Sequence, residues 1–451
     1  MPKPDAFERG NIEHLFLDFM QMKDFAAKPI IMKSAHGVWY EDVEGKKYLD
    51  GLSGVFVANA GHGNKRIIQA IRAQLDEIAF APPLHSTNMR ALELSSLLCK
   101  VLPKGLDTIK LFSGGSESTE GAMKLARQFH RQTGNPHKFK VISRYEGYHG
   151  ATMGALGASG ITKRKVTFEP FGPGYIHVFP PTCYRCPYGL EYPDCAVLCA
   201  TIIEKVVKQE DPSTVSAIIV EPIGNTGGII TPPIEYFKIL REIADKYRIV
   251  LIFDEIITGF GRTGRMFAAQ TFGVTPDIIC MGKGMSSGYA PVGGIAFNDE
   301  IADAFYGKPE DNVQFNHGHT FGGNPLSSAA AMASVSEIRD RNLPKNAREM
   351  GAKIVSRLDE LKELGVIGDV RGRGLMIGVE FVKDTKTKKQ FEDGVNFGLK
   401  VGKRALQKGL ILRYDPHWIA FAPPLVINKG ETEKMMDIFS ESLRETLKQV
   451  N

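Results

Sequence analysis

YRIVLIFDEIITGFGRTG, at residues 247–264, is the segment from which the rest of the chain is interpreted. Its apolar run at residues 249–253 stops at Asp254, which is typical of a buried parallel strand that ends at the carboxyl edge of a sheet. Ligands of open α/β sheets bind at that edge. A second apolar run, residues 278–281, is followed by Lys283 between two glycines. The sequence therefore predicts a carboxylate and an amine at one sheet edge.

This pair of residues suits pyridoxal phosphate, which needs a lysine for covalent attachment and an acid beside its pyridine nitrogen. The simpler interpretation is that Lys283 is a solvated loop residue and that Asp254 caps or pairs locally. However, burying an acid at the end of an apolar strand costs several kcal/mol unless a cation lies beside it. A protonated pyridine would be such a cation.

The same segment contains GFGRTG, residues 259–264, which matches the G-x-G-x-x-G pattern of dinucleotide-binding folds. The context differs from that fold, because Asp277 begins a predicted strand instead of ending one. The stretch after residue 264 is also too short for the required helix. We therefore expect no dinucleotide site here.

Composition indicates a large globular enzyme. The chain has 451 residues, 43% hydrophobic and 24% charged, with a formal net charge of +5 and no run of lysine or arginine. We expect neither a nucleic-acid surface nor a membrane surface. No window approaches the ~18 apolar residues of a membrane span, and the first residues lack an apolar signal region. These features predict a cytoplasmic protein.

The order of apolar patterns predicts an α/β protein. Strands and helices alternate between residues 61 and 330, which indicates a mostly parallel central sheet with helices on both faces. We predict this part to be the large domain. Residues 1–60, with a helix at 11–22 and a meander of short strands, should join residues 331–451 in a smaller α+β domain. A further helix is expected from Thr231, as its cap, to residue 247.

Three further segments carry candidate site residues. In FSGGSE, residues 112–117, a strand gives way to a helix, so that backbone amides near Gly115 and Ser116 could bind an anion; an ordinary turn with a serine cap is the alternative. Tyr148 lies on a glycine-flanked loop and could stack on a flat ring, although most loop tyrosines only pack. A buried strand at residues 215–220 should bring Glu221 to the same edge as Asp254.

Four of the six cysteines follow the pattern C-x2-C-x8-C-x3-C at Cys183, Cys186, Cys195 and Cys199. Four thiolates at such spacing could hold zinc or an iron–sulfur cluster. The central spacer is shorter than that of most zinc ribbons. The interpretation preferred from sequence is therefore no metal, with reduced packed thiols or a disulfide.

The ordered motifs FSGGSE, YHG, VEPI, FDEIITGFGRTG, GKG and HTFGGNP make the chain resemble the class III aminotransferases, pyridoxal-phosphate enzymes of fold type I. The resemblance extends from residue 36 to residue 427 and is strongest to the ω-amine:pyruvate branch. It implies that Lys283 holds pyridoxal 5′-phosphate covalently and that Asp254 pairs with the pyridinium nitrogen. It also implies a homodimer or tetramer with shared sites. The other cofactor-binding residues that it implies are Gly115, Ser116, Tyr148, Glu221, Ile257 and, from the other subunit, Thr320.

The resemblance also bears on the substrates. Relatives that act on 4-aminobutyrate or ornithine carry a glutamine and a glutamate where this chain has Ile257 and Thr226. Phe56 stands where the ω-amine:pyruvate branch often has an indole, and Arg413 matches an arginine thought to grip the oxo acid. A salt bridge at a strand end is the alternative for Arg413.

The expected activity is transfer of an amino group from a primary amine or ω-amino acid to an oxo acid, expected to be pyruvate, by a ping-pong mechanism. Tyr148 would line the substrate pocket together with Phe56 and Arg413. An epimerase or aminomutase on the same fold is the alternative. A pyridoxal-phosphate-binding transcription regulator is not expected, because residues 1–60 contain no helix-turn-helix pattern.

Overall fold

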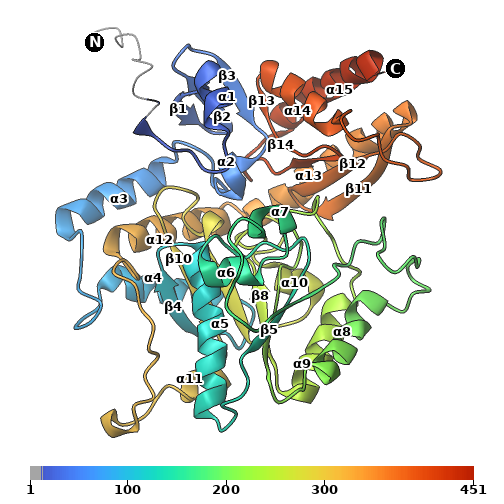
Figure 1. The fold of residues 1–451 in the computed structure, drawn as a ribbon. Helices are drawn as coiled ribbons and strands as arrows, with labels where there is room; N and C mark the ends of the chain where they lie inside the picture. Colours follow the sequence, from blue (N-terminus) through green and yellow to red (C-terminus); the bar gives the residue numbers. More distant parts are fainter. Residues whose placement is uncertain (1–11, 13, 451) are drawn as a thin grey trace.

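A seven-stranded sheet lies at the centre of the molecule (Figure 1). The structure is a computed structural model that describes residue 12 and residues 14–450. In spatial order the strands are β4 (Thr108–Phe112), β10 (Gly293–Phe297), β9 (Ile278–Met281), β8 (Val250–Asp254), β7 (Val215–Val220), β5 (Lys140–Arg144) and β6 (Tyr175–Val178). Strand β10 is antiparallel to both of its neighbours, and the other pairs are parallel. The predicted mostly parallel sheet is confirmed.

Helices cover both faces of this sheet because its strands are apolar on both sides. Along β8, Val250 and Ile252 belong to one core cluster, whereas Leu251 and Phe253 belong to the other. The first cluster includes the buried face of α5 (Gly115–Gln132). The helices that contribute to the second include α3 (Lys65–Glu77), α4 (Met89–Val101), α8 (Leu198–Gln209), α9 (Tyr236–Tyr247) and α12 (Pro325–Asp340).

Two small sheets stand apart from the central one. The first contains β1 (Met32–His36), β2 (Trp39–Asp42), β3 (Lys47–Asp50) and β13 (Leu410–Ile411). Because β13 pairs with β3, early and late segments of the chain lie side by side, as the blue and orange-red ribbons show (Figure 1). The second contains β11 (Ile367–Arg373), β12 (Met376–Phe381), β15 (Trp418–Phe421) and β14 (Arg413–Tyr414). The boundaries at residues 60 and 330 stay a prediction.

The remaining helices are mostly short. Three of them accompany the small sheets: α13 (Leu343–Glu360), α14 (Phe397–Gln407) and α15 (Lys429–Val450). The others are α1 (Met22–Ala27), α2 (Ser53–Phe56), α6 (Met153–Ala158), α7 (Thr162–Lys165), α10 (Ala268–Phe272) and α11 (Asp299–Asp303). Among the described residues, none of the helices has the length and apolar character needed to cross a membrane.

The helix predicted at residues 11–22 is wrong where the structure describes this segment. Residues 15–21 contain no helix, and α1 begins only at Met22. Phe16 and Phe19, which would have formed the apolar stripe, are 90% and 77% exposed. A short helix without a packed face is marginal in water, so the apolar spacing alone does not produce one.

One predicted helix start is also wrong. Thr231 does not cap α9, which begins at Tyr236. The cause is the pair Pro232 and Pro233, because a residue that precedes proline is disfavoured in the helical region. In α5 the capping position belongs to Gly114, so Ser116 lies inside the first turn.

Candidate active site

Three neighbouring parallel strands, β7, β8 and β9, end at one edge of the central sheet. Glu221 follows β7, Asp254 ends β8, and Lys283 follows β9 after one glycine. A cavity of about 230 Å³ lies at this edge. Its lining residues are Gly115, Ser116, Tyr148, His149, Gly150, Glu221, Ile223, Asp254, Ile256, Ile257 and Lys283. The edge therefore gathers all the predicted cofactor-binding residues except Thr320.

Lys283 reaches the cavity from the first turn after β9. It begins the short turn η2 (Lys283–Met285), and its backbone φ of 40° lies in the left-handed region that residues other than glycine rarely adopt. Burial lowers the pKa of its ammonium group, an effect that the carboxylates of Asp254 and Glu221 oppose. The amine therefore becomes neutral, and able to act as a nucleophile, at a lower pH than an exposed lysine.

Asp254 is 4% exposed, and two donors hold its carboxylate. Its Oδ2 lies 2.8 Å from Nδ1 of His149, and its Oδ1 accepts the N–H of Ile256 at 3.2 Å. His149 is buried as well: its N–H donates to Oγ of Ser159 at 2.9 Å, and its carbonyl accepts the hydroxyl of Thr119 at 2.6 Å. The carboxylate is thus fixed in direction before any ligand enters.

No local pattern in the sequence identifies His149 as a partner of Asp254. The two residues are 105 positions apart, so only the packing of the loop after β5 onto the end of β8 brings them together. The motif YHG, in which His149 follows Tyr148, is the one signal that points to this histidine.

Glu221 shapes the cavity by holding the loop that carries Tyr148. Its Oε1 accepts the N–H of Tyr148 at 2.9 Å, and its Oε2 accepts the N–H of Asn225 at 3.1 Å. Burial raises the pKa of this carboxyl, whereas the nearby His149 acts to lower it. The guanidinium carbon of Arg164 lies 4.9 Å from the centre of the Tyr148 ring, so the tyrosine is held at both its backbone and its ring.

The N-terminus of α5 forms the anion-binding end of the cavity. In the described residues, the amide groups of Gly115, Ser116 and Glu117 have no hydrogen-bond acceptor. Free amides at the start of an 18-residue helix, together with its dipole, favour a negative charge there. A Cβ atom at Gly115 would lie 3.0 Å from Ile256, so glycine leaves the space open.

These features fit pyridoxal phosphate. A lysine with a lowered pKa, a buried carboxylate and a helix N-terminus with free amides all face one cavity. They match the three polar parts of that cofactor, namely its aldehyde, its ring nitrogen and its phosphate. Tyr148, Ile223, Ile256 and Ile257 add apolar and aromatic surface to the lining, which suits a flat ring.

Arg413, on β14, is a half-buried cation. Burial lowers the pKa of its guanidinium to about 10, and the charge of Arg164 adds to that effect. Its guanidinium carbon lies 5.3 Å from the centre of the Trp418 ring. Among the described residues, no carboxylate lies within ion-pair distance of it. The strand-end salt bridge considered from sequence is therefore absent.

Three predicted site residues are not among those that line the cavity: Arg413, whose charge still lowers the pKa of Lys283, and Phe56 and Thr320. Phe56 is 1% exposed and belongs to the larger core cluster. Thr320 is exposed on the segment that leads into α12. Within this single chain none of the three residues lines the cavity, and their roles stay predictions.

Comparisons with known proteins agree on one family. The family model "Aminotransferase class-III" matches residues 21–443. The adenosylmethionine-8-amino-7-oxononanoate aminotransferase of Geobacter sulfurreducens is 36% identical over 95% of both chains. The putrescine–pyruvate aminotransferase of Pseudomonas aeruginosa is 31% identical over 96% of this chain and 93% of its own. An (S)-enantioselective omega-transaminase from Thermomicrobium roseum has a similar structure, with a TM-score of 0.91 at 35% identity, covering 98% of this chain and 97% of its own.

Proposed function

The chain belongs to the class III aminotransferases, which use pyridoxal 5′-phosphate, and on this basis we propose that it moves the amino group of a primary amine or ω-amino acid to pyruvate. The proposed mechanism is ping-pong: the amine leaves its nitrogen on the enzyme, and pyruvate collects it in a second half-reaction. The known relatives differ in the amine for which they are named, so the donor is proposed only as a class.

In this proposal each polar group of the cavity holds one part of the cofactor. Lys283 holds it covalently, and Asp254, oriented by His149, binds the ring nitrogen. The free amides of Gly115 and Ser116 bind the phosphate, and Tyr148 lies against the ring. When bound, pyridoxal phosphate supplies an electron sink for the pair of electrons left when a C–H bond of the amine breaks.

Lys283 is also the proposed carrier of the proton. The lowered pKa of Lys283 favours the neutral form of its Nζ, which would allow this amine to act as a base at the cavity. It can therefore take the proton from the substrate carbon and return it to another atom in the same cavity. The role proposed for Asp254 is to stabilise a cation beside it.

The observation that carries the choice of an oxo acid is the half-buried guanidinium of Arg413, which has no carboxylate within ion-pair distance among the described residues. A buried charge without a partner is costly, and a carboxylate that binds it would gain a charged hydrogen-bonded pair. Ile257 gives the lining of the cavity an apolar residue in place of the glutamine of other branches. A site with one such cation and an apolar wall suits amines without a carboxylate in one half-reaction and pyruvate in the other.

The test is product stoichiometry. The purified enzyme, loaded with pyridoxal phosphate, is given a simple primary amine with pyruvate or with 2-oxoglutarate, and alanine, glutamate and the carbonyl product are measured. We expect one alanine per carbonyl product, slower turnover with 2-oxoglutarate, and none in Lys283→Ala. A strict preference for 2-oxoglutarate would reject the pyruvate proposal.

The alternative activity is separated by the same assay. An epimerase or aminomutase would invert or rearrange a chiral amine without forming alanine. Net amine exchange with pyruvate excludes that outcome, and inversion in the absence of any oxo acid would establish it.

A further inference from the structure

Four cysteines line one small cavity away from the active site. Cys183, Cys186, Cys195 and Cys199, all with free thiols, border a space of about 20 Å³, which is close to that of one small ion or water molecule. The other lining residues are Pro180, Pro181, Thr182, Pro187, Tyr188, Leu190, Tyr192, Val197, Leu198 and Pro233. This lining contains no carboxylate and no histidine, so sulfur is its principal ligand chemistry.

The thiols are near enough to influence one another. The pKa of the Cys199 thiol is raised to about 12, first by burial and then by the other three thiols. In the part of the chain that the structure describes, no three such side chains already surround one point closely enough to hold a metal ion. A bound ion would therefore have to draw the sulfurs inward across the space that they share.

The backbone permits such a movement. Of the four cysteines only Cys199 lies in a helix, α8, which begins at Leu198. Cys183, Cys186 and Cys195 lie in the turns that precede it, where no strand or helix would have to break. The loop between Cys186 and Cys195 contains Gly189, whose φ of 67° is in the left-handed region that favours glycine.

We propose that these four thiols bind one zinc ion as a structural site separate from the active site. Two closely spaced pairs, C-x2-C and C-x3-C, come from the two ends of one loop, which is the arrangement of ligands in tetrathiolate zinc sites. A lining of sulfur favours zinc over calcium or magnesium, which need oxygen ligands. Each thiol loses its proton when it binds, and no change of oxidation state is involved.

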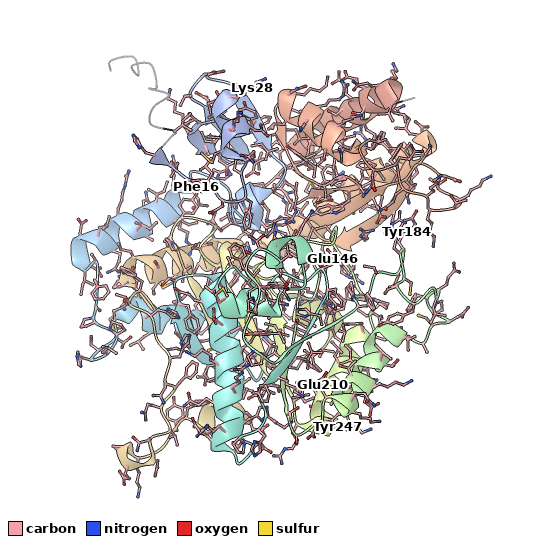
Figure 2. All side chains as sticks on the ribbon, in the orientation of Figure 1. Phe16, Lys28, Glu146, Tyr184, Glu210 and Tyr247 are labelled. Atoms are coloured by element: carbon pink, nitrogen blue, oxygen red, sulfur yellow. The ribbon has the colours of Figure 1, made fainter. Side chains whose placement is uncertain are left out.

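The site would fasten the loop to the second small sheet. Arg185, between the first two cysteines, forms an ion pair with Glu380 on β12, and Arg371 on β11 binds the same carboxylate at 2.8 Å. Tyr184 packs on β11 so closely that a Cβ atom at Gly368 would lie 2.4 Å from its hydroxyl. Figure 2 shows Tyr184 where the green loop meets the orange strands. A zinc ion behind this contact would stabilise it without touching the cavity of Lys283.

The decisive experiment is elemental analysis of the full-length protein purified without chelator. We expect about one equivalent of zinc per chain in the wild type and in the matched control Cys99→Ser, whose cysteine lies outside the loop. The variant Cys186→Ser/Cys195→Ser should hold less than about a tenth of an equivalent. A chelator should lower the apparent Tm of the wild type and the control but not that of the double variant. Turnover below the melting range should be unchanged in all three, which separates this site from the proposed function.

Several outcomes would overturn the zinc assignment. One is wild-type protein with less than about a tenth of an equivalent of zinc, both as purified and after incubation with zinc and removal of the excess. A second is metal-free protein whose intact mass shows a disulfide, and a third is iron with acid-labile sulfide. If the double variant does not fold, titration of the wild-type thiols still tests the zinc site. A chelator should expose four additional reactive thiols. No increase in the number of reactive thiols would reject the site.

Discussion

Arg413 is the residue whose replacement tests the choice of oxo acid. If its guanidinium grips the carboxylate of pyruvate, Arg413→Ala should raise the KM for pyruvate by about 10-fold or more, which is the effect of losing a charged hydrogen-bonded pair. The KM for a primary amine should change little, and it serves as the internal control. Steady-state kinetics with each substrate varied in turn measures both. Equal increases in the two KM values would remove Arg413 from the substrate site.

His149 gives a second prediction at this scale. Because its Nδ1 donates to the buried carboxylate of Asp254, His149→Leu should weaken cofactor binding by about 10-fold or more, as a buried charged hydrogen bond is lost. His149→Asn should bind the cofactor more tightly than His149→Leu, because its amide nitrogen can occupy nearly the position of Nδ1. Titration of apoenzyme with pyridoxal phosphate measures the affinity. If both variants bind equally weakly, His149 does not act through that hydrogen bond.

Whether the sequence could predict a site residue depends on where that residue lies relative to the predicted strands. Asp254 and Lys283 were predictable because each ends or follows an apolar run, and the end of a parallel strand has a fixed place at the sheet edge. The role of His149 was not predictable, because it depends on a contact between segments that are far apart in the sequence. The unpaired state of Arg413 was not predictable either, because a strand-end arginine usually finds a carboxylate and only the packing of β14 shows that this one does not.

Among the elements, the turn after β8 is one of those that join the large sheet to the small ones. Arg262 in this turn is 0% exposed. It donates to the carbonyl oxygens of Leu375 at 3.0 Å and Pro423 at 2.6 Å, and to side-chain oxygens of Ser53 at 2.8 Å and Asn59 at 2.6 Å. A single guanidinium thus satisfies buried acceptors from both the early and the late parts of the chain.

Replacing this arginine should loosen that junction. Arg262→Met leaves several buried acceptors without donors and should lower the free energy of unfolding by about 3 kcal/mol or more. For a chain of this length that corresponds to a fall of about 3 °C in Tm. The matched control is Arg265→Met, which removes an exposed arginine three residues away and should leave Tm within about 1 °C. Scanning calorimetry of both holoenzymes measures the difference, and equal shifts would contradict the proposed role of Arg262.

The elements show which sequence signals are reliable. Long apolar or amphipathic runs gave the strands β7, β8 and β9 and the helices α3 and α5, because their side chains have a core to pack against. The helix expected at residues 11–22 did not form, and Leu15, Phe16 and Phe19 are 60%, 90% and 77% exposed within this chain. In α3 the apolar side chains are only partly buried, because Ile67 is 0% exposed whereas Leu75 is 55% exposed. Hydrophobic periodicity thus predicts a helix, but it does not predict what packs against the apolar face of that helix.

At the scale of the whole molecule, exposed apolar side chains gather near Thr320. The neighbouring Phe321 is 58% exposed, and its ring lies 6.1 Å from that of Phe80, which is 42% exposed. Leu84, in the same connection between α3 and α4 as Phe80, is 88% exposed. Large apolar side chains that are exposed together mark surfaces that bind another protein. We therefore expect this face to bind a second copy of the chain, with Thr320 near the cofactor phosphate of the partner.

Subunit complementation tests this arrangement. If each site combines Lys283 of one subunit with Thr320 of the other, a heterodimer of Lys283→Ala and Thr320→Ala chains has one intact site, because both lesions fall together in the other site. Random exchange makes half of the dimers mixed, so the mixture should recover up to about a quarter of wild-type activity. The assay should use a cofactor concentration at which Thr320→Ala alone is mostly empty. Native mass spectrometry of differently tagged chains confirms the exchange. Mixed dimers that are no more active than the parents would place Thr320 and Lys283 in sites of the same subunit, because that arrangement leaves a lesion in every site.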